Sequence, residues 1–453
     1  MLTDAGVCQE KLIKSIIGSY MEKAEEVAKS AVRFTNPNYA LRDRKIDKIL
    51  TSRRFGFPIM LMLLGAIFFI TIVLANYPSM LLSFIFGWLE ARLNVFFSWI
   101  GAPYWIHGPV IDGIYKTTAW VVSVMLPPMA IFFPLFTFLE DLGYLPRVAF
   151  NLDNAFRKCG CSGKQSLCMC MGFGCNAAGV IGARIIDSPR ERTIAILTNN
   201  FVPCNGRFPQ LIAISTIFIG GMFVNAFVSG VVAALCLTGI VVLGILATLL
   251  VSKLLNKTLL RGMPSSFSLE LPPYRRPQIG KILWRSLFER TAFVLWRAVK
   301  VAIPAGLIIW LLANIRVHDA PLIYYIANFF DPLAYLMGLD GSVLTAFLLG
   351  FPANEIVLPL TLMCYSQNNT LTDFTSFSEL GMILKGAGWT VFTGISMLIF
   401  TLFHFPCATT CLTIKKETGS LRWTLVSIIL PTLVGIAACI AFTGVVRLIM
   451  LFI

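Results

Sequence analysis

The chain has 453 residues, of which 57% are hydrophobic and 13% charged. Soluble domains carry about 25% charged residues, so this composition excludes a soluble globular protein. Several stretches reach the ~20 apolar residues that a membrane span needs, which predicts an all-α polytopic membrane protein. The net charge of +14 does not indicate nucleic-acid binding, because the basic residues cluster between apolar spans, where Lys and Arg mark the cytoplasmic side.

Residues 1–56 form a polar extension, predicted to be a cytoplasmic helical linker. Over residues 8–34 apolar side chains recur every three or four positions, which predicts an amphipathic helix. A second, short helix is expected from Asp43 to Leu50. Arg53 and Arg54 then mark the inner face of the membrane before the first span.

Residues 57–116 are predicted to hold the first span, Phe57 to Ala75, and an external interfacial segment. Charges and prolines over residues 78–116 disfavour a crossing, whereas the aromatic side chains there suit the membrane surface. The next span, about Thr117 to Leu139, opens a first repeat over residues 117–251. Pro127-Pro128 should break this span.

Within the first repeat, Ser166 to Ala183 is too short and too rich in Gly to cross, so a re-entrant segment is expected. Two spans follow, at about Thr193 to Ile219 and Met222 to Val251. Residues 252–292 are then expected to be a cytoplasmic loop, because eight basic and two acidic residues lie between positions 252 and 290.

Residues 293–453 form the second repeat, with spans at about Phe293 to Ile315 and Gly388 to Leu412. Ser342 to Tyr365 could cross or turn back. A crossing would place the basic residues after position 412 outside, so the positive-inside rule favours a second re-entrant segment, entered from outside. The result is about seven spans, two re-entrant segments and a cytoplasmic N-terminus.

An internal repeat supports this topology. The segment from Gly172 to Asn176 parallels that from Gly350 to Asn354, and Pro203-Cys204 parallels Pro406-Cys407. Each half contains a span, a re-entrant segment and two more spans, and the halves enter their re-entrant segments from opposite sides. Inverted repeats of this kind are typical of secondary transporters, which bind substrate near the bilayer midplane at broken helices.

The broken helices offer donors for a transition metal. Pro203 and Pro406 each free a backbone carbonyl, and a cysteine follows each proline. A carboxylate among apolar residues of a membrane segment is functional by default, and one occurs in the second re-entrant segment. The candidate metal ligands are therefore Cys204, Cys407, Glu355, Cys175, Asn176 and Asn354. The alternative is that the thiols only pack as apolar side chains.

Other polar residues are assigned to gating or structure. Arg207 lies three residues after Cys204 and would repel a cation bound there, so it is assigned to gating or structure. Pro203 and Pro406, which break helices, are placed in the same class. Glu140 and Asp141 are expected at the cytoplasmic surface, where they either assist metal exit or cap a helix. Gly163-Lys164 is followed by Gln165 and lacks the phosphate-loop pattern, so no nucleotide hydrolysis is expected.

The sequence resembles the membrane portion of the bacterial ferrous iron transport protein B (FeoB) family. The similar segments run from residue 40 to the C-terminus; they are Gly108-Pro109 to Gly113, Leu139-Glu140-Asp141-Leu142-Gly143-Tyr144, Gly172-Phe173-Gly174-Cys175-Asn176, Pro203-Cys204-Asn205-Gly206-Arg207, Leu271-Pro272-Pro273-Tyr274, Glu355-Ile356-Val357 and Phe405-Pro406-Cys407 with Lys415-Lys416-Glu417.

The resemblance implies two gate repeats that import Fe(II) across a bacterial inner or plasma membrane, energised by a GTPase not encoded in this chain. No permanently bound cofactor is expected, and Fe(II) is the transported ion. The expected partners are the lipid bilayer, a separate GTPase or a small Feo-type cytoplasmic protein, and a second copy of the chain. Two alternatives stay open: a gate-type transporter of another divalent metal or a small solute, and a non-transporting membrane scaffold.

Overall fold

The computed structural model describes residues 9–31, 41–52, 54–223, 225–262, 274, 277–317, 320–366 and 377–452. Over these residues the fold is helical apart from a short antiparallel hairpin of β1 (Arg316–Val317) and β2 (Ala320–Pro321). Six helical stretches are long and apolar enough to cross a membrane, or seven if a pair bent by 113°, α14 (Leu322–Leu336) and α15 (Gly341–Leu349), is one span. The predicted all-α multi-pass fold is confirmed.

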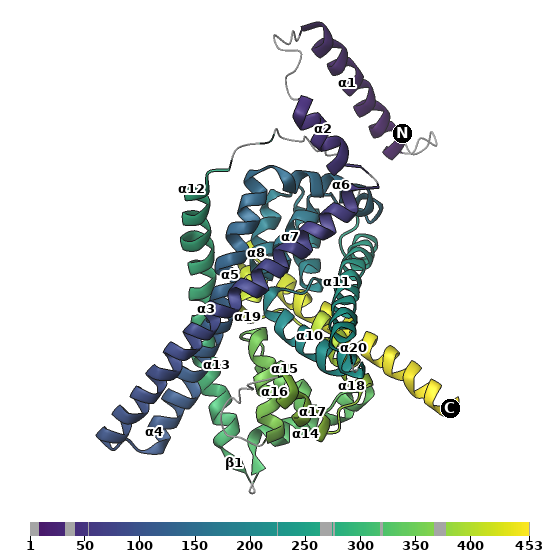
Figure 1. Cartoon of the computed structure of the whole chain (residues 1–453). Helices are drawn as coiled ribbons and strands as arrows, with labels where there is room; N and C mark the ends of the chain where they lie inside the picture. The colour runs from purple at the N-terminus through teal and green to yellow at the C-terminus, as the bar shows by residue number, and fades with distance from the viewer. Residues whose placement is uncertain are drawn as a thin grey trace.

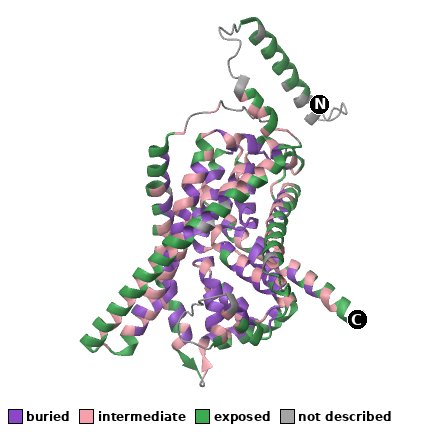
Figure 2. Ribbon diagram, viewed as in Figure 1, coloured by how far each residue is buried: buried purple, intermediate pink, exposed green. Residues whose placement is uncertain are grey.

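The polar extension contains the two predicted helices, α1 (Gln9–Ala31) and α2 (Leu41–Leu50). Apolar side chains of α1, including Tyr20 and Val27, are exposed. Figure 2 shows that the described part of α1 is exposed, whereas buried residues gather among the central helices of the membrane portion.

The first span is longer than expected. Helix α3 (Gly56–Ile100) continues through Pro78 and stops at Gly101, whose φ of 69° is left-handed. After α4 (Tyr104–Gly108) and the π-helix η1 (Pro109–Tyr115), α5 (Lys116–Asp141) packs back along α3 (Figure 1). The expected helix end at Ala75 and the expected break at Pro127-Pro128 are wrong. In an apolar setting a helix keeps its remaining backbone hydrogen bonds on both sides of a proline, because no water is present to replace them.

Apart from the 32-residue helix α11 (Ala226–Lys257), the rest of the first repeat consists of shorter helices. The predicted re-entrant segment is a pair of packed helices, α7 (Gln165–Gly174) and α8 (Asn176–Gly182), separated by Cys175. The expected span from 193 to 219 is interrupted between Thr198 and Phe208. In order, the elements are α6 (Tyr144–Lys158), α7 (Gln165–Gly174), α8 (Asn176–Gly182), η2 (Ala183–Ile185), α9 (Pro189–Thr198), η3 (Asn199–Phe201), η4 (Asn205–Arg207), α10 (Phe208–Ile214), η5 (Ser215–Ile219), η6 (Gly220–Met222) and α11 (Ala226–Lys257).

The second repeat has a similar order of helices but also contains the β1–β2 hairpin and α17 (Phe377–Gly386). The segment Ser342 to Tyr365, which could cross or turn back, lies within α15 and α16 (Val357–Ser366) and the turn between them. These helices are nine and ten residues long and pack against each other. Each is about 15 Å long at 1.5 Å per residue, half of the ~30 Å hydrocarbon core, which favours turning back. The remaining elements are α12 (Ile279–Trp284), η7 (Arg285–Thr291), α13 (Ala292–Asn314), η8 (Asn354–Ile356), α16 (Val357–Ser366), α17 (Phe377–Gly386), α18 (Val391–Phe403), α19 (Ala408–Thr418) and α20 (Leu421–Phe452).

Matched backbone geometry supports the repeat. Asp153 Oδ1 accepts a hydrogen bond from the Gly163 backbone N at 2.9 Å, and Asp331 Oδ1 accepts one from the Gly341 N at 2.7 Å. The two Asp residues are 178 positions apart in the sequence, and so are the two Gly residues. At the same offset, Cys175 (φ −154°, ψ 125°) and Ala353 (φ −152°, ψ 126°) hold the same extended conformation between two helices.

Helix α2 is tied to the first repeat by an ion pair. The Arg147 guanidinium of α6 is 1% exposed and donates from Nε and Nη2 to the two Asp47 oxygens at 3.0 and 3.2 Å. The Tyr274 hydroxyl donates to Asp47 Oδ1 at 2.7 Å, and the Tyr274 ring lies 4.1 Å from Arg147 Cζ. Burial raises the pKa of Asp47, but these hydrogen bonds outweigh it and the pKa is lowered. Three segments distant in sequence therefore meet at one buried charge.

Asp47→Asn should loosen α2, because the substitution leaves the buried Arg147 charge without its carboxylate. We expect amide hydrogen exchange over residues 41–50 to be at least several-fold faster, whereas Asp43→Asn on the same helix should exchange like the wild type. Since the pKa of Asp47 is lower in the folded state, the Asp47–Arg147 ion pair contributes its full stabilisation at neutral pH. This stabilisation is lost as pH falls through the folded pKa of Asp47. Equal exchange in the Asp47 and Asp43 variants would contradict this role.

Candidate cation site at the broken helices

The helix breaks of both repeats meet at a small cavity of about 30 Å³, enough for a water molecule or one metal cation. Sulfur, carboxylate, amide and hydroxyl groups line it together with small residues and two methionines of α5. All six side chains predicted as metal ligands are among its lining residues: Cys175, Asn176, Cys204, Asn354, Glu355 and Cys407.

Four helices begin at this cavity. Cys175 precedes α8, Cys204 precedes η4, Ala353 precedes η8 and Cys407 precedes α19. The backbone N–H groups at a helix N-terminus favour negative charge. Prolines at positions 203 and 406 explain two of the breaks, since the residue after each proline is extended rather than helical.

The donors are close but do not form a closed shell. Asn354 Nδ2 lies 3.7 Å from Cys204 Sγ, and Cys407 Sγ lies 3.3 Å from Thr410 Oγ1. The Glu355 carboxylate rests against Gly206, where an added Cβ would come within 2.3 Å of Oε1. Within the described part of the chain, no three His, Cys, Asp or Glu side chains are grouped closely enough to hold a metal ion. The cavity thus gathers groups that can donate to a metal, but among the described residues they do not form a closed metal cage.

Arg207 does not line the cavity. Its side chain is fully buried and donates from Nη1 to the backbone oxygens of Asn200 and Leu402, at 3.0 and 2.9 Å. Nη2 donates to Asn200 Oδ1 and to the oxygens of His404 and Phe405, at 3.1, 3.0 and 3.3 Å. One guanidinium therefore satisfies carbonyls at the breaks of both repeats.

An amide relay that the sequence analysis missed connects Arg207 to the cavity. Asn176 Nδ2 donates to Asn200 Oδ1 at 3.0 Å, and Asn200 Nδ2 donates to the His404 oxygen at 2.8 Å. The His404 ring is buried between the Thr401 oxygen and Asn354 Oδ1, at 2.9 and 3.2 Å. The adjacent amides of Asn199 and Asn200 inside an apolar stretch were the available signal.

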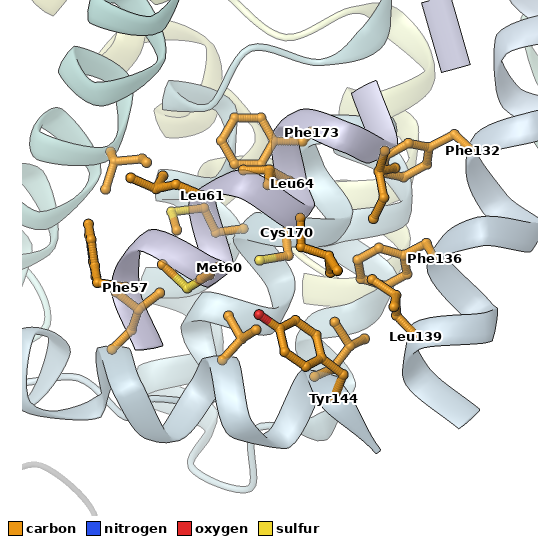
Figure 3. Close-up of a pocket in the computed structure, with 17 residues that line it drawn as sticks. Phe57, Met60, Leu61, Leu64, Phe132, Phe136, Leu139, Tyr144, Cys170 and Phe173 are labelled. Atoms are coloured by element: carbon orange, nitrogen blue, oxygen red, sulfur yellow. The ribbon is translucent and has the colours of Figure 1, made fainter. Parts of the chain in front are cut away.

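Glu140 and Asp141 lie exposed at the end of α5 and do not line the cavity. A second cavity, of about 60 Å³, lies between α3, α5, α6, α7 and α11 (Figure 3). Its lining is apolar except for the Tyr144 hydroxyl and the Cys170 thiol, which point into it. It lacks a set of metal donors, so the smaller cavity is the candidate cation site.

Comparison with known sequences assigns the chain. Residues 122–218 and 295–421 match the Gate family, described as nucleoside recognition, and residues 237–289 match the family described as ferrous iron transport protein B C terminus. Over 416 residues the chain is 29% identical to the Fe(2+) transporter FeoB of Staphylococcus aureus (strain MSSA476), covering 90% of this chain and 60% of that protein. The chain belongs to the FeoB family. It corresponds to the membrane portion.

Two further FeoB relatives match over a similar share of this chain. The Fe(2+) transporter FeoB of Campylobacter jejuni is 26% identical over 399 residues, with 84% of this chain and 62% of the relative covered. A Porphyromonas gingivalis protein named Fe(2+) transport protein A/Fe(2+) transporter FeoB fusion protein is 26% identical, with 85% and 49% covered. The chain spans about half to three fifths of the FeoB relatives it matches. No solved structure matches.

The six candidate ligands of this chain at the cavity all lie within the two Gate segments. The first segment covers Cys175, Asn176 and Cys204, and the second covers Asn354, Glu355 and Cys407. The matched families include no GTPase domain. The cavity is therefore the meeting point of the two Gate segments of this FeoB membrane portion.

Arg207→Met should prevent correct folding, because five acceptors lose a hydrogen bond. Asn200 Oδ1 and the His404 oxygen keep a second donor, but the backbone oxygens of Asn200, Leu402 and Phe405 lose the bond from Arg207, and each group left unsatisfied costs about 1–3 kcal/mol. Arg207→Lys should recover little, since an ammonium cannot reach both breaks with the fork of a guanidinium. We expect most of the monodisperse protein to be lost in fluorescence-detected size-exclusion chromatography. Arg447→Met, which removes a partly exposed arginine bonded to the Tyr335 oxygen, is the control. A well-folded Arg207→Met protein would refute the structural role.

Proposed function

We propose that this chain is the membrane part of an Fe(II) importer and that the ion passes through the cavity between the two Gate segments. The observation that carries the proposal is the convergence of thiol, carboxylate and amide groups from both repeats at one cavity. Relatives named Fe(2+) transporter FeoB support Fe(II) as the substrate.

The donor chemistry suits a borderline transition metal. Cys204, Cys407 and Cys175 supply sulfur, which favours Fe(II) over Mg²⁺ or Ca²⁺, while Glu355 and the amide oxygens of Asn176 and Asn354 add harder donors. Transport requires binding that is favourable on entry and weak enough for release. A cavity without a closed cage meets that requirement better than a structural metal site.

A GTPase outside these residues would supply energy. The exposed apolar side chains of α1 are a surface on which a separate GTPase, a small Feo-type cytoplasmic partner or a second copy of this chain could dock. The Porphyromonas gingivalis relative, whose name joins Fe(2+) transport protein A to FeoB in one chain, supports a partner of the second kind. We place the protein in a bacterial inner or plasma membrane with the N-terminus in the cytoplasm.

A second candidate function is transport of another divalent metal or a small solute. The Gate family is described as nucleoside recognition, which favours the organic solute. The cavity volume of about 30 Å³ argues against it, because small-molecule sites are commonly 300–1,000 Å³. A non-transporting scaffold would leave the convergence of donors without a role.

Cys204→Ser and Cys407→Ser should each lower Fe(II) uptake into proteoliposomes about tenfold or more, and the double variant further, because a hydroxyl is a poorer ligand for Fe(II) than a thiolate. Cys439→Ser removes a buried thiol outside the cavity and is the matched control. Uptake is measured with the energising GTPase present and with Mn²⁺, Zn²⁺ and Mg²⁺ as competitors. Normal uptake by the double variant would exclude a thiolate pathway, and a wild type that moves no metal would favour the scaffold.

Reporter cysteines test the orientation. We expect an impermeant thiol reagent to reach a cysteine at Lys257 or Lys416 only from the cytoplasm, because Lys and Arg accumulate on that side. A cysteine at Asn368, which lies outside the described residues, should be reached only from outside. Cytoplasmic labelling at Asn368 would mean that the second re-entrant segment crosses and that the repeats are not inverted.

A further inference from the structure

Two helices connect the cavity to one end of the molecule. Helix α8 of the first repeat begins after Cys175, and α19 of the second repeat begins after Cys407; both cysteines line the cavity. The two helices pack against each other. Because they start at the same cavity and their far ends also meet, the seam between them leads from the cavity to the surface.

An ion pair closes the far end of this seam. Arg184, two residues after α8, donates from Nε and Nη2 to the Glu417 carboxylate of α19 at 2.8 and 2.7 Å. The Glu417 side chain is 10% exposed, whereas that of Arg184 is 61% exposed. The arginine therefore covers a largely buried carboxylate from the solvent side. Ordinary exposed ion pairs contribute little net stability, but a bidentate arginine pair with a largely buried carboxylate contributes more, so this one can hold the seam closed.

Apolar side chains pack within the seam. Ile414 of α19 packs with Val180 and Ala183 in one buried cluster. A cation leaving along this route must part α8 from α19, and that motion separates Arg184 from Glu417.

The polar end of the seam faces the basic side of the protein. Lys164 donates to Asp187 at 2.7 Å, which places the loop between α6 and α7 beside the end of α8. Arg190 donates to the Leu260 oxygen at 3.2 Å, so the segment after α11 lies nearby. This is the side that the distribution of Lys and Arg assigns to the cytoplasm.

We propose that the seam between α8 and α19 is the exit of the cation from the cavity and that the Arg184–Glu417 ion pair is the gate that keeps it closed. The gate rests on the proposed function for its cargo, but its closure can be measured without transport. In this structure Cys411 is buried and Cys407 is partly exposed, and opening the seam would expose both further to water.

The test is the labelling rate of Cys407 and Cys411 in the purified full chain, using a charged methanethiosulfonate and peptide mass spectrometry. Arg184→Gln and Glu417→Gln each remove one half of the pair and should speed labelling about tenfold. The exchanged variant Arg184→Glu/Glu417→Arg restores an ion pair and should label at the wild-type rate. Asp187→Asn breaks the neighbouring exposed pair with Lys164 and should have no effect.

Wild-type labelling rates in both single variants would overturn the gate, as would an exchanged variant that labels as fast as the single variants. These outcomes are independent of iron uptake. Rapid labelling in the single variants with restoration in the exchanged variant supports the gate even if Fe(II) is not the cargo. Intact Fe(II) uptake with unchanged labelling removes the gate and leaves the proposed function.

Discussion

The buried guanidinium of Arg207 is the interaction on which the site depends. A helix broken at membrane depth leaves carbonyl groups that water cannot satisfy, and each is costly. Arg207 bonds such carbonyls in both repeats, at Asn200 and at Leu402, His404 and Phe405. It thereby fixes the two breaks relative to each other. Its positive charge is directed into the backbone, so it does not occupy the cavity that the breaks enclose.

The repeats share a backbone but differ in chemistry. Cys175 and Ala353 have the same extended geometry, yet only the first carries a thiol. Glu355 of the second repeat corresponds, at the offset of 178 residues, to Ala177 of the first. A symmetric framework thus carries an asymmetric site, with most of the sulfur on one side and the carboxylate on the other.

Local patterns in the sequence predicted which side chains lie together at the cavity better than they predicted the helix ends around it. Prolines before Cys204 and Cys407 and the paralleled re-entrant motifs indicated which side chains converge, because helix breaks at membrane depth are rare and are marked by residue type. The extent of α3 was not predictable in this way, since Pro78 and the charges beyond it look like a terminus. The relay through Asn200 and His404 joins residues 204 positions apart, and no local periodicity reports such a contact.

The length of α3 has a consequence for how the protein sits in its membrane. Its 45 residues extend about 68 Å, more than twice the ~30 Å hydrocarbon core. Membrane helices tilt by at most about 40°, so much of the hairpin formed with α4 and α5 must lie outside the core. Exposed Trp99 and Trp105 near its tip suit the headgroup level. The hairpin would therefore set the position of the protein along the bilayer normal. Hydrophobic mismatch in a thicker or thinner bilayer would displace α5, which also contributes Met125 and Met129 to the cavity wall.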